Sequence, residues 1–315
     1  MKRLVTGIAV SVAMLAVPAA AQASTSSAHS SQFGSGANYY LALGDSLSVG
    51  VQPTPAGTDV PTGVGYANQL YSHLRSFYSH GTLDFADLGC PGETTATLVN
   101  GGICGYSGDQ RTSYTSDTGS QLNAALAFIT DHPGHVPLIT LDIGANDLNP
   151  CIALGTISGI ESCLPAVFEK IETNLGTSLA KLKAADPTAT IVGMNYYDPE
   201  LESWLGGTSA DQTFAADSIV LSDDFNQVLA GTYGYFKVPV ADVADAFRTS
   251  DFTTMVLTGP EWGAPLVPED VAEICKLTWE CAPAPQGPNE HCTYAGYAVI
   301  ASTFLSTPAI RSFLR

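Results

Sequence analysis

Two hydrophobic patterns alternate along this chain. Five short, continuous apolar runs are typical of buried β-strands. They are Tyr39–Leu43, Leu83–Leu88, Leu138–Ile143, Ala189–Met194 and Phe236–Val243. Between the runs lie longer amphipathic stretches of helical length, such as residues 66–80 and 165–185, which are typical of helices with one buried face. The pattern therefore predicts strands and helices in alternation.

This alternation predicts the fold class. Parallel strands need long crossover connections, usually helices, which then cover both faces of the sheet. We therefore predict an α/β fold: a three-layer sandwich with a five-stranded parallel sheet in the doubly wound, flavodoxin-like order. In such sheets ligands bind beyond the carboxyl ends of the strands, where the strand order reverses. The loops after the first three strands are accordingly where chemistry is expected.

The N-terminal residues have the pattern of a secretory signal peptide. Lys2 and Arg3 precede an apolar stretch, Leu4–Val17, which is followed by Ala21-Gln22-Ala23. A basic start, an apolar centre and small residues at the end are the three parts of such a peptide. A membrane anchor is the alternative, but the apolar stretch is shorter than the ~20 residues that span a bilayer. We predict cleavage after Ala23 and a secreted, extracellular protein without stable membrane insertion.

The remaining 292 residues are expected to form one folded domain. Residues 24–37 are small, polar and rich in glycine and serine, which is typical of a flexible leader. Residues 38–315 are within the range of a single α/β domain, and we expect a monomer. Removal of the signal peptide leaves 10 basic and 30 acidic residues, a net charge of −20. Such a charge disfavours binding to nucleic acid or to an anionic membrane.

The seven cysteines indicate disulfides, because disulfides persist in exported proteins. Their clustering along the chain suggests three local pairs and leaves Cys292 over. The pairs are Cys90 with Cys104, Cys151 with Cys163, and Cys275 with Cys281. Cys292 is expected to be a buried, inert thiol, although pairing with Cys275 or Cys281 is an alternative. No zinc-binding pattern occurs, and we expect neither a metal nor another cofactor.

Three loops carry the candidate chemistry. The first strand ends in Gly44-Asp45-Ser46-Leu47, the second is followed by Cys90-Pro91-Gly92, and the third by Gly144-Ala145-Asn146-Asp147. Each loop alone is explained equally well as an ordinary turn or helix cap. Together they bring a hydroxyl, a glycine amide and a carboxamide to one crevice. That set supplies a nucleophile and oxyanion donors for acyl transfer.

A serine nucleophile needs a base, and His291 is the best-placed histidine. It lies in a loop just before a predicted C-terminal helix. His73 and His80 fall in a predicted helix, and His132 and His135 precede the third strand, at the wrong end of the sheet. A surface histidine near a helix start is the alternative reading of His291.

With these residues the chain resembles the SGNH, or GDSL-type, hydrolase family. The four family blocks match the GDSL stretch at Gly44–Leu47, Gly92, the GxND stretch at Gly144–Asp147, and His291. These blocks occur in order over nearly the whole predicted domain. The stretches GCPGETT, TLDIGANDLNPC and PNEHCTYAGYAVIA are similar to secreted actinobacterial esterases and lipases with three disulfides.

The resemblance implies a role for each matching residue. Ser46 would be the nucleophile and His291 the general base. The main-chain amides of Ser46 and Gly92 and the side chain of Asn146 would hold the oxyanion. Asp45 is expected to be structural. Substrates in this family range from lipid and phospholipid esters to short-chain esters and acetylated sugars; a polar insertion near Cys104 favours soluble or short-chain esters slightly.

One departure from the family concerns the group that orients His291. Most members have an aspartate three residues before the histidine, where this chain has Pro288. The Pro288 carbonyl is our first candidate for accepting the Nδ1–H bond, and the Glu290 carboxylate is the second. The missing aspartate also leaves a different class open: a catalytically impaired secreted binding protein on the same scaffold. No GxSxG stretch occurs, so the α/β-hydrolase nucleophile elbow is not supported.

Overall fold

The structure, a computed structural model, describes residues 36–115, 119–258 and 266–315. The predicted signal peptide, residues 1–23, lies outside the described residues, as does all of the predicted leader except residues 36 and 37.

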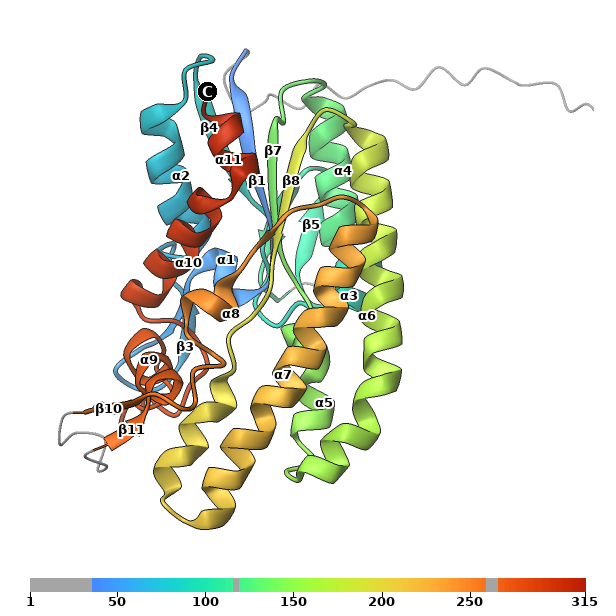
Figure 1. The fold of residues 1–315 in the computed structure, drawn as a ribbon. Helices are drawn as coiled ribbons and strands as arrows, with labels where there is room; N and C mark the ends of the chain where they lie inside the picture. The colour runs from blue at the N-terminus through green and yellow to red at the C-terminus, as the bar shows by residue number, and fades with distance from the viewer. Residues whose placement is uncertain (1–35, 116–118, 259–265) are drawn as a thin grey trace, which may run out of the picture. The chain divides into compact units, whose positions relative to one another are not determined.

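The centre of the fold is a five-stranded sheet in which every strand pairs in parallel (Figure 1). The strands are β1 (Asn38–Gly44), β4 (Leu83–Asp87), β7 (Leu138–Asp142), β8 (Thr190–Met194) and β9 (Val240–Ala241). Their spatial order is β4-β1-β7-β8-β9, which is the flavodoxin-like order. The predicted fold class is therefore confirmed.

Four of the five predicted strands agree with the structure to within one residue at each end, and the fifth does not. We predicted Phe236–Val243, but β9 contains only Val240 and Ala241. Phe236 is the C-cap of the preceding helix, and Val243 already begins α8 (Val243–Ala246), which Asp242 caps. The apolar run therefore overestimated the strand, because its two ends belong to helix termini, with Phe236 half-buried and Val243 buried.

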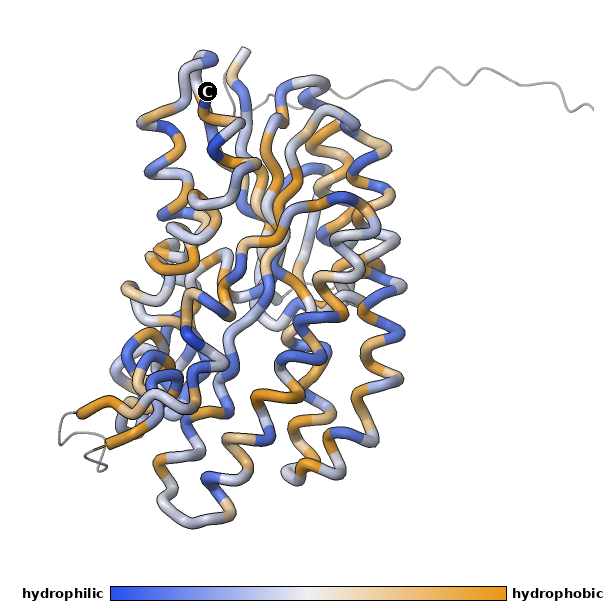
Figure 2. The backbone as a smooth tube through the Cα atoms, viewed as in Figure 1, coloured by the Kyte–Doolittle hydropathy of each residue, from blue (hydrophilic) through white to orange (hydrophobic). Residues whose placement is uncertain are grey.

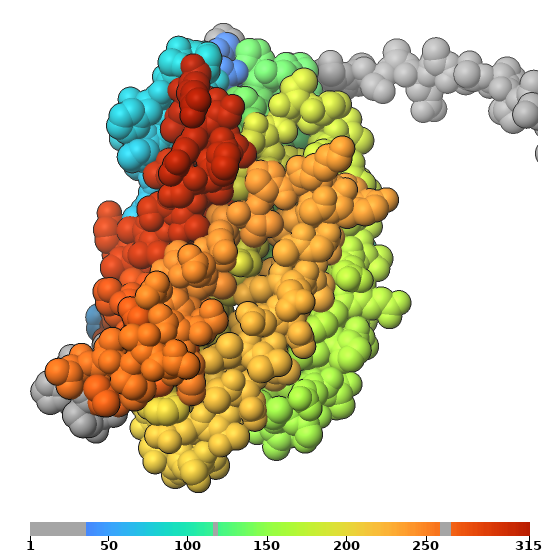
Figure 3. All heavy atoms as spheres, viewed as in Figure 1, coloured from blue at the N-terminus to red at the C-terminus, as the bar shows by residue number. Residues whose placement is uncertain are grey.

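Helices cover both faces of the sheet in the described part of the chain (Figure 1). One layer contains α2 (Tyr66–Phe77), α10 (Tyr294–Ser306) and α11 (Pro308–Phe313). The other contains α4 (Gln121–Asp131), α6 (Ile157–Ala185) and α7 (Ser209–Tyr235). On the face seen in Figure 3, α7 fills the strip between α6 and the C-terminal residues. None of the helices in these ranges is long and apolar enough to span a bilayer.

Hydroxyl side chains set where the main helices begin. Ser120, Thr156, Thr208 and Thr293 each accept a hydrogen bond from a main-chain N–H in the first turn, of α4, α6, α7 and α10 respectively. At α7 the cap is reciprocal, since Asp211 also accepts from the N–H of Thr208. Such caps satisfy amides that have no partner within the helix.

The core lies between the sheet and the two helical layers. Figure 2 shows hydrophobic residues concentrated along β1, β7 and β8. All five residues of β7 are buried, as expected of a central parallel strand covered on both faces. Two polar side chains of this core pair with each other: the hydroxyls of Tyr40 and Thr140 lie 2.7 Å apart.

Shorter elements extend beyond the carboxyl ends of the strands. They are α1 (Ser46–Val49), α3 (Thr95–Asn100), η1 (Ala145–Leu148), α5 (Asn149–Ile152), η2 (Pro199–Gly206), α9 (Glu269–Leu277) and the hairpins β2–β3 (Val51–Pro53 and Asp59–Pro61), β5–β6 (Gly105–Ser107 and Gln110–Ser113) and β10–β11 (Met255–Leu257 and Leu266–Pro268). The three predicted disulfides are formed. Cys292 is a free, buried thiol as predicted. Burial raises its pKa to about 12, which disfavours the reactive thiolate at neutral pH.

The packing of α7 on the sheet gives a prediction for Gly193. A Cβ on this residue of β8 would lie 2.3 Å from the Tyr233 ring, and Tyr233 is fully buried. Overpacking of this kind costs about 1–3 kcal/mol, so Gly193→Ala should lower the free energy of unfolding in a denaturant titration by that amount. Gly231→Ala, on the open side of α7, is the control and should stabilise by about 0.5–1 kcal/mol. Equal stability of Gly193→Ala and wild type would contradict this packing.

Candidate active site

The first strand must end in glycine because of its neighbour in the sheet. Gly44 pairs with Asp142 of β7, and a Cβ on Gly44 would lie 1.9 Å from Asp142 Oδ1. Its φ of +147° is also in the region that favours glycine. Gln121 holds this residue from the other side, since Oε1 accepts from the Gly44 N–H (2.6 Å) and Nε2 donates to the Gly44 carbonyl (2.9 Å).

Ser46 follows as the first residue of α1. Asp45 caps this short helix by accepting from the Leu47 N–H at 2.9 Å. The Ser46 side chain is 8 % exposed and lines the cavity described below. As the first helical residue, its N–H has no carbonyl partner within the helix. The turn thus presents both a hydroxyl and a main-chain donor.

The second loop lies beside this turn. The Cys90 N–H donates to the Gly44 carbonyl at 3.0 Å, and the disulfide to Cys104 holds the same cysteine. Gly92 follows with a φ of +78°, and the space where its side chain would stand is open. Gly92 is exposed, so its main chain is accessible to a ligand.

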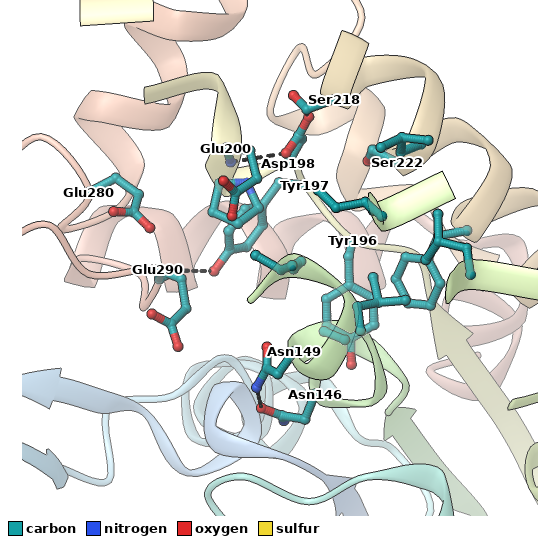
Figure 4. A pocket seen from close by; sticks show the side chains of 18 of the residues that line it. Asn146, Asn149, Tyr196, Tyr197, Asp198, Glu200, Ser218, Ser222, Glu280 and Glu290 are labelled. Atoms are coloured by element: carbon teal, nitrogen blue, oxygen red, sulfur yellow. Dashed lines mark hydrogen bonds between the residues drawn. The ribbon is translucent and has the colours of Figure 1, made fainter. Parts of the chain in front are cut away.

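The third loop is fastened to the second. Asn146 Nδ2 donates to the Glu93 carbonyl at 3.0 Å, and its Oδ1 accepts from Asn149 at 3.4 Å (Figure 4). The Asp147 carboxylate accepts from the N–H and hydroxyl of Thr95, at 2.7 and 2.6 Å. These bonds fix the carboxamide of Asn146 next to the Gly92 loop.

His291 stands in a braced loop ahead of α10. Its carbonyl accepts from the Trp279 N–H at 2.9 Å, and the Tyr197 hydroxyl donates to the Glu290 carbonyl at 2.6 Å. The Cys275–Cys281 disulfide closes the short segment that contains Trp279. His291 is buried, with 7 % of the whole residue exposed, and lines the same cavity as Ser46 and Asn146.

The imidazole ring contacts a residue that sequence reasoning missed. Its Nδ1 lies 2.9 Å from Asn289 Oδ1. Asn289 Nδ2 in turn donates to Asp59 Oδ1 at 2.8 Å. In the part of the chain that the structure describes, the ring's hydrogen-bond partner is thus Asn289 rather than the Pro288 carbonyl or the Glu290 carboxylate. The only signal in the sequence was an amide two residues before the histidine.

Two carboxyls are buried behind the turn at residues 44–46. The Asp45 N–H donates to Asp142 Oδ2 at 3.2 Å, the Tyr66 hydroxyl to Asp142 Oδ1 at 2.5 Å, and the Tyr196 hydroxyl to Asp45 Oδ2 at 3.0 Å. Burial raises the pKa of both carboxyls, and repulsion by Asp45 raises that of Asp142 further. Because their oxygens accept hydrogen bonds from main-chain N–H groups and tyrosine hydroxyls of this chain, both residues support the turn.

The cavity has a volume of about 300 Å³ and two unlike sides. Apolar side chains from η1, α5, α6 and α7 form one side: Leu148, Ile152, Ile157, Ile160, Leu164, Phe214, Leu221 and Phe225. Glu200, Glu280 and Glu290 gather on the other, away from Tyr196 and Ser222 (Figure 4). Sequence reasoning missed Glu200 and Glu280, because they come from segments far apart in the chain.

Crowding of these acids changes their titration. Burial, with repulsion from Glu290, raises the pKa of Glu280 to about 8. Burial, with repulsion from Asp198 and Glu202, raises the pKa of Glu200 to about 7. Both groups therefore take up protons near neutral pH. Over residues 36–115, 119–258 and 266–315, no group of three or more histidine, cysteine or acidic side chains is arranged to hold a metal ion.

Comparison with known proteins identifies sequence and fold similarities. The model of the GDSL-like Lipase/Acylhydrolase family matches residues 42–260. An extracellular lipase from Streptomyces rimosus is 20 % identical, with 88 % of this chain and 99 % of that chain covered and a TM-score of 0.50. A phospholipase A1 from Streptomyces albidoflavus is 17 % identical, with 88 % and 99 % covered and a TM-score of 0.48. A search of curated proteins finds no match.

The raised pKa of Glu280 predicts how stability depends on pH. Between its ordinary value of 4.5 and about 8, the folded state holds more protons than the unfolded state. The free energy of unfolding therefore falls as pH rises through this window. Glu280→Gln removes the ionisable group, so its melting temperature should exceed that of wild type at pH 8.5 and nearly equal it at pH 5. Glu161→Gln, at an exposed position of α6, is the control. An equal shift at both pH values would contradict the raised pKa.

Proposed function

This chain belongs to the GDSL-like lipase/acylhydrolase family, and we propose that it is a secreted serine ester hydrolase that forms an acyl-enzyme on Ser46. The observation that carries the proposal is that Ser46, Asn146 and His291 line one cavity with a largely apolar side. The proposed nucleophile Ser46, its base His291 and the oxyanion donor Asn146 thus share a cavity that also fits an acyl group.

The proposed reaction follows the usual course of serine acyl transfer. Ser46 Oγ attacks the ester carbonyl carbon while its proton passes to His291 Nε2, and the carbonyl electron pair moves to oxygen. When the tetrahedral intermediate collapses, the C–O bond to the alcohol breaks and Nε2 returns the proton to the leaving oxygen. Water then repeats the sequence on the acyl-enzyme and releases the acid.

Three donors would stabilise the oxyanion: the N–H groups of Ser46 and Gly92 and the carboxamide of Asn146. Asn146 Nδ2 uses one hydrogen on the Glu93 carbonyl, and an amide nitrogen carries two, so the second is available to substrate. The hydrogen bonds of these loops to Gly44 and Glu93 hold the donors before substrate arrives. Preorganised donors of this kind are worth about 100-fold or more in turnover each.

The two sides of the cavity support a substrate with distinct ends. The apolar side chains of α5, α6 and α7 fit the acyl portion. The acidic side is formed by Glu200, Glu280 and Glu290. As pH rises through the raised pKa values of Glu200 and Glu280, about 7 and about 8, this side gains negative charge and disfavours esters with an anionic alcohol portion. We therefore propose that neutral esters with an apolar acyl group are the substrates. This extends the expectation from sequence, which favoured soluble or short-chain esters.

Secretion is supported by the disulfides. Three bonds in one chain fit an oxidising compartment, and the S. rimosus neighbour is described as extracellular. Together with the predicted signal peptide, this favours an exported enzyme. A monomer stays a prediction.

One experiment tests both catalysis and substrate class. p-Nitrophenyl esters from acetyl to palmitoyl are assayed with wild type, Ser46→Ala and, as a control, Ser72→Ala at an exposed position of α2. Ser46→Ala should lose at least about 1,000-fold in kcat, while Ser72→Ala keeps wild-type activity. In wild type, kcat/KM should rise up to about fourfold per buried methylene, since each contributes about 0.8 kcal/mol, until the cavity is full.

Two results would contradict the proposal separately. Unchanged hydrolysis by Ser46→Ala would overturn the serine mechanism. Hydrolysis by neither wild type nor Ser46→Ala over the whole series would favour the alternative of a binding protein on this scaffold. A flat chain-length profile in an active enzyme would exclude only the acyl site on the apolar side.

A further inference from the structure

We propose that the carboxamide of Asn289, itself held by the carboxylate of Asp59, orients the His291 ring in place of the aspartate that this chain lacks. The inference rests on the proposed function, because it concerns the base of that reaction. Asn289 acts through His291 and is therefore a positioning residue, as is Asp59.

The neighbours of Asn289 fix which way its amide points. Oδ1 accepts from the main-chain N–H of His291 at 3.0 Å, which requires an acceptor at that position. Nδ2 donates to Asp59 Oδ1 at 2.8 Å, which requires a donor at the other. A flipped amide would place its NH₂ group against the His291 N–H and its oxygen against the Asp59 carboxylate, and neither pair can form a hydrogen bond. Both contacts therefore select the same orientation.

This orientation decides the tautomer of the histidine. The atom 2.9 Å from Nδ1 is the amide oxygen, which only accepts hydrogen bonds. Nδ1 must therefore carry the ring proton, and Nε2 keeps the lone pair that a general base needs. This is the orienting task that the triad aspartate performs in other serine hydrolases. Here a neutral amide performs it.

Asp59 adds the negative charge that a neutral amide lacks. Its second oxygen, Oδ2, lies 3.7 Å from His291 Nδ1, close enough to favour the imidazolium that forms during the reaction. The side chain of Asp59 is 44 % exposed and that of His291 only 9 %, so solvent weakens but does not remove this attraction. The negative charge thus lies on Asp59, behind Asn289, and not on the residue that hydrogen-bonds to the ring.

The hairpin that carries Asp59 is fastened to the histidine loop. The Tyr297 hydroxyl, from α10, donates to the Val51 carbonyl at 2.7 Å. Gln52 Nε2 donates to the Cys292 carbonyl at 3.3 Å. The β2–β3 hairpin therefore holds Asp59 beside Asn289 although the two residues are 230 positions apart.

A charge exchange between the two positions tests the proposal. The enzymes compared are wild type, Asn289→Ala, Asp59→Asn, the double variant Asn289→Asp/Asp59→Asn, and Asn100→Asp as an exposed control. The double variant keeps the amide–carboxylate hydrogen bond and the net charge but places the carboxylate directly on Nδ1. The readouts are kcat, KM and the pH profile of kcat/KM on one p-nitrophenyl ester, with melting temperatures to show that each variant is folded.

Each variant has a distinct expected result. Asn289→Ala should lower kcat about 30- to 100-fold with KM changed less than about twofold, because the tautomer is lost but substrate contacts remain. Asp59→Asn should lower kcat a few-fold, since the Asn289 amide still contacts the ring but the negative charge of Asp59 is removed. The double variant should keep at least about a tenth of the wild-type kcat and move the acidic limb of the profile up by about half a pH unit or more, because direct contact with a carboxylate favours the protonated ring. Asn100→Asp should match wild type.

The failures of the two proposals are distinguishable. If Ser46→Ala is inactive but folded Asn289→Ala stays within about threefold of wild type, the Asn289 assignment is overturned and the Pro288 carbonyl becomes the orienting group. If Asn289→Ala does not fold, the double variant decides: an acidic limb at the wild-type position would show a purely structural pair and overturn the proposal. If Ser46→Ala stays active, the proposed function itself fails.

Discussion

The contact between Gly44 and Asp142 is the constraint on which the rest of the site depends. The two residues are paired at the carboxyl ends of adjacent parallel strands, and no side chain fits on Gly44. Because Asp142 also accepts from the Asp45 N–H, the chain must turn away from the sheet at this point. Ser46 is therefore presented at the sheet edge by packing inside the sheet, rather than by the loop alone.

The other loops are built outward from this turn. The Gly44 carbonyl accepts from the Cys90 N–H and from the Gln121 side chain, which aligns the second loop with the first. Asn146 then binds the Glu93 carbonyl and aligns the third loop with the second. The histidine loop is held separately, by the Cys275–Cys281 disulfide and by the β2–β3 hairpin. Two independently braced parts thus meet at the cavity.

Sequence allowed the parts that depend on local pattern to be predicted. Short, contiguous signals marked the strands and the motif residues Ser46, Asn146 and His291. The alternation of strands and helices predicted the sheet order, and the clustering of cysteines predicted the three disulfides. The fifth strand was overestimated, because an apolar run at Phe236–Val243 does not distinguish a strand from the ends of two helices. Asn289 with Asp59, and Glu200 with Glu280, come together only through tertiary packing, so no sequence pattern shows that they are neighbours.

We propose that Ser46 is an activated nucleophile in a preorganised acyl-transfer site. The most direct measurement is reaction of the folded protein with a fluorophosphonate, followed by intact-mass analysis and peptide mapping. Such a reagent phosphonylates a serine whose hydroxyl is activated by a neighbouring base. We predict a single adduct, located on Ser46, that does not form after denaturation. Labelling of another serine, such as Ser48 or Ser218, or no labelling of a folded, ester-hydrolysing protein, would contradict it.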